Sequence, residues 1–496
     1  MKRFIRLNAA DNVAVALADG AATGDIFVDG GRAVRLVSPI CRGHKFALSD
    51  IRCGEPVIKY GFPIGHATRD IAPGEWVHTH NLATSLGDNL TYAYHPRTLP
   101  HMPQPKCPVI NGYLRYNGEM GIRNELWIIP TVGCVNSQAQ AIAGRLRSEC
   151  DMTGVDGVQV LSHSYGCSQL GDDHANTRKA LASLALHPNA GGVLVIGLGC
   201  ENNQLSGLRE QMGSWDPDRV RFLISQDVDD EVEAGVALCR QLIERMRHDR
   251  RQPLPMSKLR VGLKCGGSDG LSGITANPLV GRLSDRVVAC GGTTVLTEVP
   301  EMFGAETILM DRAADRSVFE KTVSLINDFK EYFRSYGQPV YENPSPGNKA
   351  GGITTLEEKS LGCVQKGGTV PVTDVLQYTA RLSVAGLNLL AAPGNDLVAA
   401  TALAISGCQI VLFTTGRGTP FGTCVPTMKI STNSQLAARK PRWIDFDAGV
   451  LVESADMDTL VEELLDKVLR VCDGERLCHE HTGSGQIAIF KTGVTL

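Results

Sequence analysis

The 496-residue sequence contains no run of about 18 consecutive apolar residues, the length that a membrane-spanning helix needs. Its first residues, Met1-Lys2-Arg3-Phe4-Ile5-Arg6, lack the apolar stretch of a signal peptide. Positive charge is not in excess either, since the formal net charge is −4 and the pI is near 6.3. The sequence therefore favours neither nucleic acid nor a membrane surface as a partner, and we expect a cytoplasmic protein.

The sequence also lacks the regular cysteine spacing of a disulfide framework, and it lacks nucleotide-binding motifs. The fifteen cysteines are scattered, which is typical of a reducing compartment where thiols stay free or bind metal. No Walker pattern occurs, and Gly197-Leu198-Gly199-Cys200-Glu201-Asn202 departs from the dinucleotide fingerprint at its last position. Both absences count against a nucleotide-dependent oxidoreductase.

One motif is present three times between residues 127 and 200. Short apolar runs lead at equal spacings to three Gly-Cys pairs, which end in Cys134, Cys167 and Cys200. Such runs suit buried parallel strands, whose carboxyl ends are where ligands bind. Three thiols there would suit a soft metal or an iron–sulfur cluster. The competing interpretation is structural, because cysteine is often buried and glycine permits a tight turn.

The alternation of strand-like and helix-like segments predicts an α/β protein with mainly parallel sheets, preceded by a small all-β module. Short strands broken by Gly and Asp turns place this module at residues 1–95. A proline-rich linker follows at 96–112, and an α/β domain with the three Gly-Cys units at 113–250. After a second linker at 250–258, a C-terminal α/β domain with Gly-rich loops covers 259–496.

Apolar runs predict several strands of the C-terminal domain, at 261–265, 287–289, 293–296, 387–391 and 410–413. Long polar insertions at 343–368 and 414–427 interrupt them, and structureless loops of that length are usually functional. Cys363 lies in the first insertion. Glu298 and Glu301 follow a predicted strand, where a buried acid or base and a solvated strand end are equal alternatives.

Two histidines lie near the end of the N-terminal module. His78 and His80 are two residues apart, which on a strand places both side chains on one face. That arrangement suits a divalent ion or an acid–base pair, and His44 could join them from a neighbouring strand end. Histidines on an exposed strand face can also be solvated surface only.

Four loops of the C-terminal domain combine glycine with amide or hydroxyl side chains and a charge. Backbone N–H groups, hydroxyls and a cation suit a small polyhydroxylated acid, with phosphate as the competing ligand. Loops of this composition can also be simple turns. The candidate substrate-binding residues are Lys264, Ser268, Asp269, Asn348, Lys349, Asn395 and Arg417.

Eight long motifs are spread over the chain, at 127–134, 163–174, 197–203, 264–278, 297–305, 344–352, 416–420 and 487–496. They resemble the altronate/galactarate dehydratase family of sugar-acid hydro-lyases. The similarity covers essentially the whole chain, and residues 59–65 and 78–81 resemble a β-clip (SAF) domain. The full-length match favours altronate over galactarate.

The resemblance implies the dehydration of D-altronate to 2-dehydro-3-deoxy-D-gluconate in hexuronate (galacturonate) catabolism, with Fe(2+) or Mn(2+) as cofactor. A metal ion would stabilise the charge that develops when the weakly acidic C2 proton leaves. Histidine suits the acid or the base of such a reaction. The catalytic candidates are therefore His44, His78, His80 and His163, and the carboxylate clamps are Lys264, Lys349 and Arg417.

Two metal sites compete within this hypothesis. One is a mononuclear site with His78 and His80 as ligands. The other is an iron–sulfur cluster, whose candidate ligands are Cys134, Cys167, Cys200 and Cys265. We expect the three Gly-Cys turns to face the histidines and the Gly-rich loops across one crevice.

Alternatives remain for the function as a whole. The substrate could be galactarate or another aldonic or aldaric acid, and a sugar-acid-binding protein is the alternative from a different class. We expect a homo-oligomer, a dimer, that acts on a small sugar acid.

Overall fold

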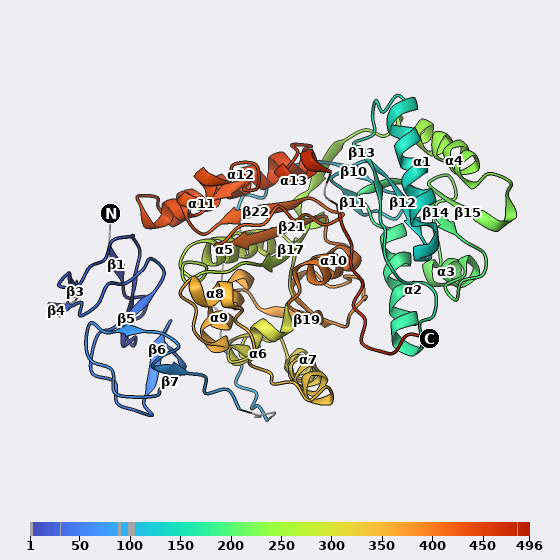
Figure 1. Ribbon diagram of the computed structural model, residues 1–496. Coiled ribbons are helices and arrows are strands. Elements are labelled where there is room, and N and C mark those ends of the chain that lie inside the picture. The colour runs from blue at the N-terminus through green and yellow to red at the C-terminus, as the bar shows by residue number, and fades with distance from the viewer. Residues whose placement is uncertain (1–2, 30, 88–90, 98–104, 484) are drawn as a thin grey trace.

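The computed structural model describes residues 3–29, 31–87, 91–97, 105–483 and 485–496. It has an N-terminal all-β module and two α/β units with parallel sheets, which confirms the predicted fold class. The N-terminal module and the first α/β unit lie on opposite sides of the C-terminal unit (Figure 1). None of the described helices is long and apolar enough to cross a membrane.

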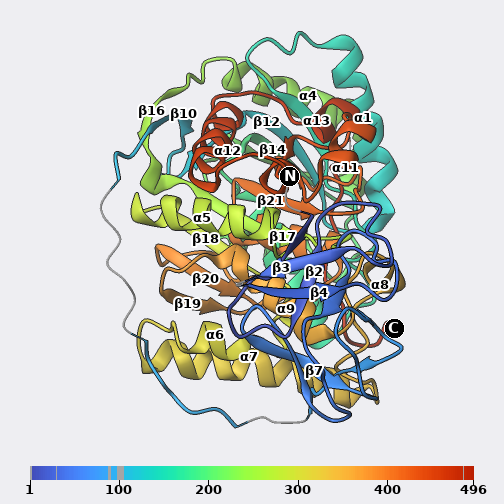
Figure 2. The ribbon, with the colours of Figure 1, turned by 90° about the vertical axis from the view of Figure 1, so that its left-hand side faces the viewer.

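The N-terminal module is built from three small antiparallel sheets, with strand orders β1-β2-β5-β8, β3-β4 and β6-β7-β9. Its strands are β1 (Phe4–Ile5), β2 (Val13–Ala16), β3 (Ile26–Asp29), β4 (Arg32–Arg35), β5 (Lys45–Ala47), β6 (Pro56–Lys59), β7 (Phe62–Ala67), β8 (Trp76–Val77) and β9 (Leu82–Ala83). Phe4, Phe27 and Phe46 meet edge to face and form a small core of their own. Viewed from its own side, the module covers part of the C-terminal unit (Figure 2).

The first α/β unit has a parallel sheet of order β13-β12-β14-β15. Its elements are β12 (Glu125–Pro130), α1 (Asn136–Glu149), β13 (Gly157–Val160), α2 (Gly171–Ala185), β14 (Ala190–Gly197), α3 (Leu205–Met212), β15 (Val220–Ile224) and α4 (Glu231–Met246). Along β12, Leu126 and Ile128 belong to the core with α1 and α4, whereas Trp127 and Ile129 belong to the core with α2. The predicted succession of strand–helix steps is confirmed.

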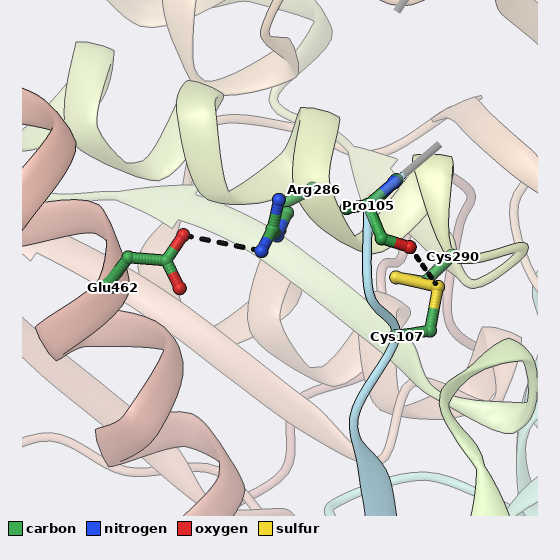
Figure 3. The surroundings of a disulfide bond; sticks show 5 residues. All are labelled: Pro105, Cys107, Arg286, Cys290 and Glu462. Carbon is green, nitrogen blue, oxygen red and sulfur yellow. Dashed lines mark hydrogen bonds and ion pairs between the residues drawn. A yellow bond between two sulfur atoms is a disulfide. The ribbon is translucent and has the colours of Figure 1, made fainter. Parts of the chain in front are cut away.

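Both predicted linkers contain strands. β10 (Val109–Leu114) pairs with β11 (Met120–Gly121) on one side and β16 (Gln252–Pro255) on the other. The two prolines of β16 are compatible with pairing because β16 is an edge strand. Cys107, just before β10, forms a disulfide with Cys290 (Figure 3). The expectation that thiols are free or metal-bound is therefore wrong for this pair.

The C-terminal unit has a seven-stranded parallel sheet of order β19-β20-β18-β17-β21-β22-β23. Its strands are β17 (Arg260–Cys265), β18 (Thr293–Leu296), β19 (Val372–Leu376), β20 (Gly386–Leu390), β21 (Ile410–Thr415), β22 (Thr427–Ser431) and β23 (Phe446–Asp447). Its helices are α5 (Ala276–Ala289), α6 (Glu306–Met310), α7 (Arg316–Ser335), α8 (Pro346–Ala350), α9 (Leu356–Cys363), α10 (Asp396–Ser406), α11 (Ser434–Arg439), α12 (Met457–Cys472) and α13 (Cys478–Thr482).

Two local predictions for this unit are wrong. Residues 287–289, predicted as a strand, end α5, because a short apolar run does not distinguish a strand from the buried face of a helix. The insertion 343–368, predicted as a structureless loop, holds α8 and α9. Every residue of α9 is buried, so the helix has no exposed polar face. Its sequence therefore shows no amphipathic period that would predict a helix.

Candidate active site

The carboxyl ends of three neighbouring strands bring charged side chains together. Lys264 of β17 is fully buried, and its Nζ contacts the carboxylate of Glu298, which follows β18. The same ammonium group donates a 2.8 Å hydrogen bond to Oδ1 of Asp396, the first residue of α10 after β20. Because β20, β18 and β17 are parallel neighbours, their carboxyl ends meet at the edge where α/β sheets bind ligands.

A tight turn after β18 places two carboxylates in this cluster. Glu298 has φ = 69°, a left-handed conformation that is uncommon outside glycine. The 3-10 turn Val299–Met302 then brings Glu301 close to Glu298. The two side chains are buried, with residue exposures of 1% and 4%. Backbone strain beside buried charge is typical of a functional site.

One face of α9 and its 3-10 extension supplies the remaining groups. Lys359, Cys363 and Lys366 are spaced four and three residues apart, which aligns their side chains. Lys359 Nζ lies 2.8 Å from Glu301 Oε1, and Lys366 Nζ lies 2.9 Å from Cys265 Sγ. The helix therefore presents two cations and a thiol to the ends of the strands.

Two thiols and one carboxylate oxygen lie in mutual contact at the centre. Cys265 Sγ is 3.3 Å from Cys363 Sγ and 3.3 Å from Glu301 Oε2, and Cys363 Sγ is 3.2 Å from the same oxygen. Within the described ranges, this is the one group of three or more His, Cys, Asp or Glu side chains whose ligand atoms all lie within 4.8 Å. Sulfur and carboxylate donors at these separations can hold a metal ion.

The pKa values of the two glutamates are shifted in opposite directions. Burial opposes ionisation of Glu301, but Lys359, Lys264 and Lys366 outweigh it and hold its pKa well below the usual range. Burial and repulsion from Glu301 raise the pKa of Glu298. Neighbouring carboxyl groups with separated pKa values are the usual basis for assigning an acid and a base.

The cluster reaches solvent at Asp396, whose side chain is 42% exposed. Gly266 and Gly267 lie beside it, since a Cβ on Gly266 would come within 2.5 Å of Asp396 Oδ1. A Cβ on Gly267 would lie 3.3 Å from the Cβ of Arg417, whose side chain is exposed. Asp396 and Arg417 therefore lie beside one glycine pair, Gly266 and Gly267, whose lack of side chains lets both approach the backbone closely.

Most predicted loop residues adjoin this cluster. Asn348 Nδ2 donates to the Ser268 carbonyl at 2.9 Å, and its Oδ1 accepts from Lys359 Nζ at 3.2 Å. Ser268 Oγ is buried and has no hydrogen-bond partner among the residues that the structure describes. Asn395 is exposed and caps α10 through two backbone N–H groups. These residues lie around the charged cluster, and their role in substrate binding stays a prediction.

Asp269 has a structural position. Its carboxylate is buried and accepts hydrogen bonds from Thr432 Oγ1 at 2.9 and 3.0 Å and from Ser272 Oγ at 3.2 Å. Gly351 and Gly416 pack directly on it. Its carboxylate therefore joins the loop after β17 to the end of β22.

His44 and His78 lie where the N-terminal module contacts α8, with ring centroids 5.2 Å apart. His78 Nε2 donates to the Lys349 carbonyl at 2.9 Å, and His44 Nε2 to the Ala350 carbonyl at 3.3 Å. Burial lowers the pKa of both imidazoles, that of His78 to about 4. Both rings are therefore neutral at pH 7 and donate hydrogen bonds to the last carbonyl groups of α8. These contacts indicate that the two histidines hold the N-terminal module against α8.

The prediction that His78 and His80 share a strand face is wrong. β8 ends at Val77, and the chain turns, with the His78 carbonyl accepting from the Asn81 N–H. His80 is exposed and packs on Trp76 at 5.0 Å between ring centroids. The turn thus separates one buried imidazole from one exposed imidazole.

His163 is satisfied by the backbone. Its Nε2 donates to the Pro130 carbonyl at 2.8 Å, and its Nδ1 accepts from the Tyr165 N–H at 3.1 Å. The side chain therefore joins the end of β12 to the segment after β13, and neither ring nitrogen is free for proton transfer.

Cys134, Cys167 and Cys200 follow three adjacent parallel strands, and all three are exposed. Their sulfur atoms are not all within 4.8 Å of one another. The first α/β unit and the N-terminal module lie on opposite sides of the C-terminal unit (Figure 1). The expectation that these cysteines face the histidines across one crevice is therefore wrong.

Sequence reasoning missed Lys359 and Lys366 altogether. The available signal was their spacing from Cys363, which aligns the three only if residues 356–367 are helical. The prediction of a structureless insertion concealed that periodicity.

Three family models match most of the chain. Residues 2–85 match the altronate/galactarate dehydratase SAF domain, 112–247 the D-galactarate dehydratase/altronate hydrolase second domain, and 256–495 the D-galactarate/altronate dehydratase C-terminal domain.

Full-length relatives agree with these domain matches. The chain is 57% identical to an altronate dehydratase of Escherichia coli (strain K12) and 55% identical to one of Bacillus subtilis (strain 168), with 100% of each chain covered. It is 32% identical to a galactarate dehydratase (L-threo-forming) of Escherichia coli (strain K12), over 98% of this chain and 96% of the relative. The chain belongs to the D-galactarate/altronate dehydratase family of hydro-lyases.

Proposed function

We propose that this protein dehydrates D-altronate to 2-dehydro-3-deoxy-D-gluconate, as a step of hexuronate breakdown. The observation that carries the proposal is the identity of 57% and 55%, over the full chain, to two altronate dehydratases. The galactarate dehydratase is more distant, at 32%. That difference favours altronate over galactarate or another sugar acid.

The reaction removes the C2 hydrogen as a proton and the C3 hydroxyl as water, and the resulting enol takes a proton at C3 to become the 2-keto acid. The C2 proton is very weakly acidic because the adjacent carboxylate is already negative. A site for this reaction needs a base, a proton donor and positive charge near the developing anion. The lysine-rich cluster at the ends of β17, β18 and β20 meets these requirements.

We assign roles by position in that cluster. Arg417, exposed beside Gly267, is the clamp for the substrate carboxylate. Asp396, at the mouth and bonded to Lys264, is the base that takes the C2 proton. Lys264 holds Asp396 and the buried Glu298 together, and its positive charge stabilises the developing anion.

The family resemblance implies Fe(II) or Mn(II), with an iron–sulfur cluster as the alternative. Two donor sets suit these groups: the buried trio Cys265, Glu301 and Cys363, and the exposed Cys134, Cys167 and Cys200. A bound divalent ion supplies Lewis-acid stabilisation of the substrate carboxylate and the leaving hydroxyl.

The test is incubation of the anaerobically purified protein with Fe(II), a reductant and D-altronate. Mass spectrometry should detect the 2-keto-3-deoxy acid and loss of one water per substrate. Galactarate and other aldonic or aldaric acids, assayed in parallel, should react more slowly. Saturable binding of D-altronate without product would instead identify a sugar-acid-binding protein.

A further inference from the structure

We infer that Cys265, Glu301 and Cys363 hold one divalent cation of borderline softness, such as Fe(II), in preference to Mn(II). The site itself is argued from donor geometry and charge. The inference rests on the proposed function only for the role of the ion in dehydration.

The donor atoms have the separations that a single ion requires. The three distances among the two Sγ atoms and Glu301 Oε2 are 3.2–3.3 Å. Ligand bonds of about 2.0–2.3 Å in a tetrahedral shell place neighbouring donors roughly 3.3–3.8 Å apart. An outward shift of a few tenths of an ångström would therefore admit the ion.

Three rigid elements hold these donors. Cys265 ends β17, Glu301 lies in the turn after β18, and Cys363 ends α9. Lys359 binds the other oxygen of Glu301, Oε1, at 2.8 Å, which leaves Oε2 for the thiols. Lys366 Nζ donates to Cys265 Sγ at 2.9 Å, which fixes the position of that sulfur atom. Supporting contacts of this kind orient and tune metal ligands.

The charge of the surroundings also suits one divalent ion. Three ammonium groups balance three carboxylates here, from Lys264, Lys359, Lys366, Glu298, Glu301 and Asp396. Exchange of two thiol protons for one dication leaves this balance unchanged. The ion therefore enters without burying uncompensated charge.

The donor set selects the ion. Two sulfur ligands favour Fe(II), Co(II) and Zn(II), whereas Mn(II) prefers oxygen. A small cavity lined by Cys363, Lys359 and Ser268 adjoins the trio. Within the described part of the chain, the buried hydroxyl of Ser268 has no hydrogen-bond partner, and a water or substrate oxygen next to the ion would supply one.

The experiment is an anaerobic titration of the chelator-treated full-length protein with Co(II), followed through thiolate-to-cobalt charge-transfer absorption. We expect saturation at one equivalent and binding at least about 10-fold tighter than that of Mn(II). Cys265→Ser and Cys363→Ser should each abolish the charge-transfer band or weaken binding at least about 10-fold. Cys408→Ser, which alters another buried free cysteine, should bind as wild type.

X-ray absorption of the wild-type protein loaded with Fe(II) keeps the inference testable if a variant fails to fold. Two sulfur neighbours at about 2.3 Å would support it. A shell of nitrogen and oxygen only would overturn it, as would iron–iron scattering that is lost on replacing Cys134, Cys167 and Cys200. If the protein binds cobalt through thiolates but does not dehydrate D-altronate, the proposed function is refuted and the metal site stands.

Discussion

At the residue scale, two glutamates three positions apart are held in different protonation environments. Glu301 faces Lys359, while Glu298 shares Lys264 with Asp396 and is repelled by Glu301. Burial and repulsion from Glu301 therefore raise the pKa of Glu298, whereas three lysines hold the pKa of Glu301 low. Asp396 is therefore the solvent-accessible member of a network of ion pairs whose other members are buried.

Replacing Asp396 with Asn tests the assigned base. We expect kcat to fall by about 10²–10⁴-fold, because the amide cannot accept the C2 proton, with a smaller change in KM. Steady-state kinetics with D-altronate measure both constants. Asp374→Asn, at an ion pair with Lys321 on the sheet edge, is the matched control and should keep wild-type kcat.

Replacing Arg417 with Met tests the carboxylate clamp. Loss of a charge-assisted hydrogen bond of about 1.5–3 kcal/mol should weaken substrate binding about 10–100-fold. The dissociation constant of D-altronate, measured by calorimetry, gives the result. Arg240→Met changes a remote exposed arginine of α4 and should leave affinity unchanged, whereas wild-type affinity in Arg417→Met would remove the clamp assignment.

At the element scale, α9 joins the N-terminal module to the candidate site. Glu358, on α9, accepts 2.8 Å hydrogen bonds from Lys45 and Lys59 of the module. Cys363 lies five residues further along the same helix and faces the strand ends. The module thus fixes the helix that carries a candidate metal ligand.

Replacing Glu358 with Gln should loosen this contact. Two buried ammonium groups would then face a neutral amide, which should lower the free energy of unfolding by about 3–5 kcal/mol. Calorimetry should show a lower Tm, and limited proteolysis should cleave the module faster. Glu320→Gln, on the exposed surface of α7, should change neither readout, and equal effects from both variants would contradict the docking role.

His78 makes the contact between the module and α8 dependent on pH. Its folded-state pKa of about 4 lies below the usual value of 6.5, so the unfolded chain takes up a proton first as pH falls. Stability should therefore be full above pH 6.5 and decline by about 1–3 kcal/mol toward pH 4. Denaturation at pH 7 and pH 5 should show a smaller loss for His78→Gln than for wild type. Replacing the exposed His248 with Gln should leave the wild-type loss intact.

Strands were more predictable than helices in this chain. The apolar runs at 293–296 and 410–413 correspond to β18 and β21, because central parallel strands are buried on both faces. The same reasoning misassigned the end of α5 and missed α9, which is buried on every side. A helix without an exposed face has no amphipathic period to read.

At the scale of the whole molecule, the site depends on strand order. Cys265, Glu301 and Cys363 meet because β18 lies beside β17 and α9 returns to their carboxyl ends. Single-sequence patterns locate strands but not their order, so the loops were predicted while the trio was not. The long motifs identified the family because they are specific over their whole length.

The disulfide between Cys107 and Cys290 makes a separate prediction. It closes a loop of 183 residues across two units, and loop-closure entropy assigns such a bridge up to about 5 kcal/mol. Reductant should lower the Tm of the wild-type protein and leave that of Cys107→Ser unchanged. Equal Tm values with and without reductant in the wild type would contradict this prediction.

The most direct test of the account is the rate of keto-acid formation from D-altronate by the Fe(II)-loaded wild-type protein and by Asp396→Asn. The account predicts one 2-dehydro-3-deoxy-D-gluconate per D-altronate consumed, at a rate at least about 100-fold lower in the variant. Product from neither protein, or from both at the same rate, would contradict it.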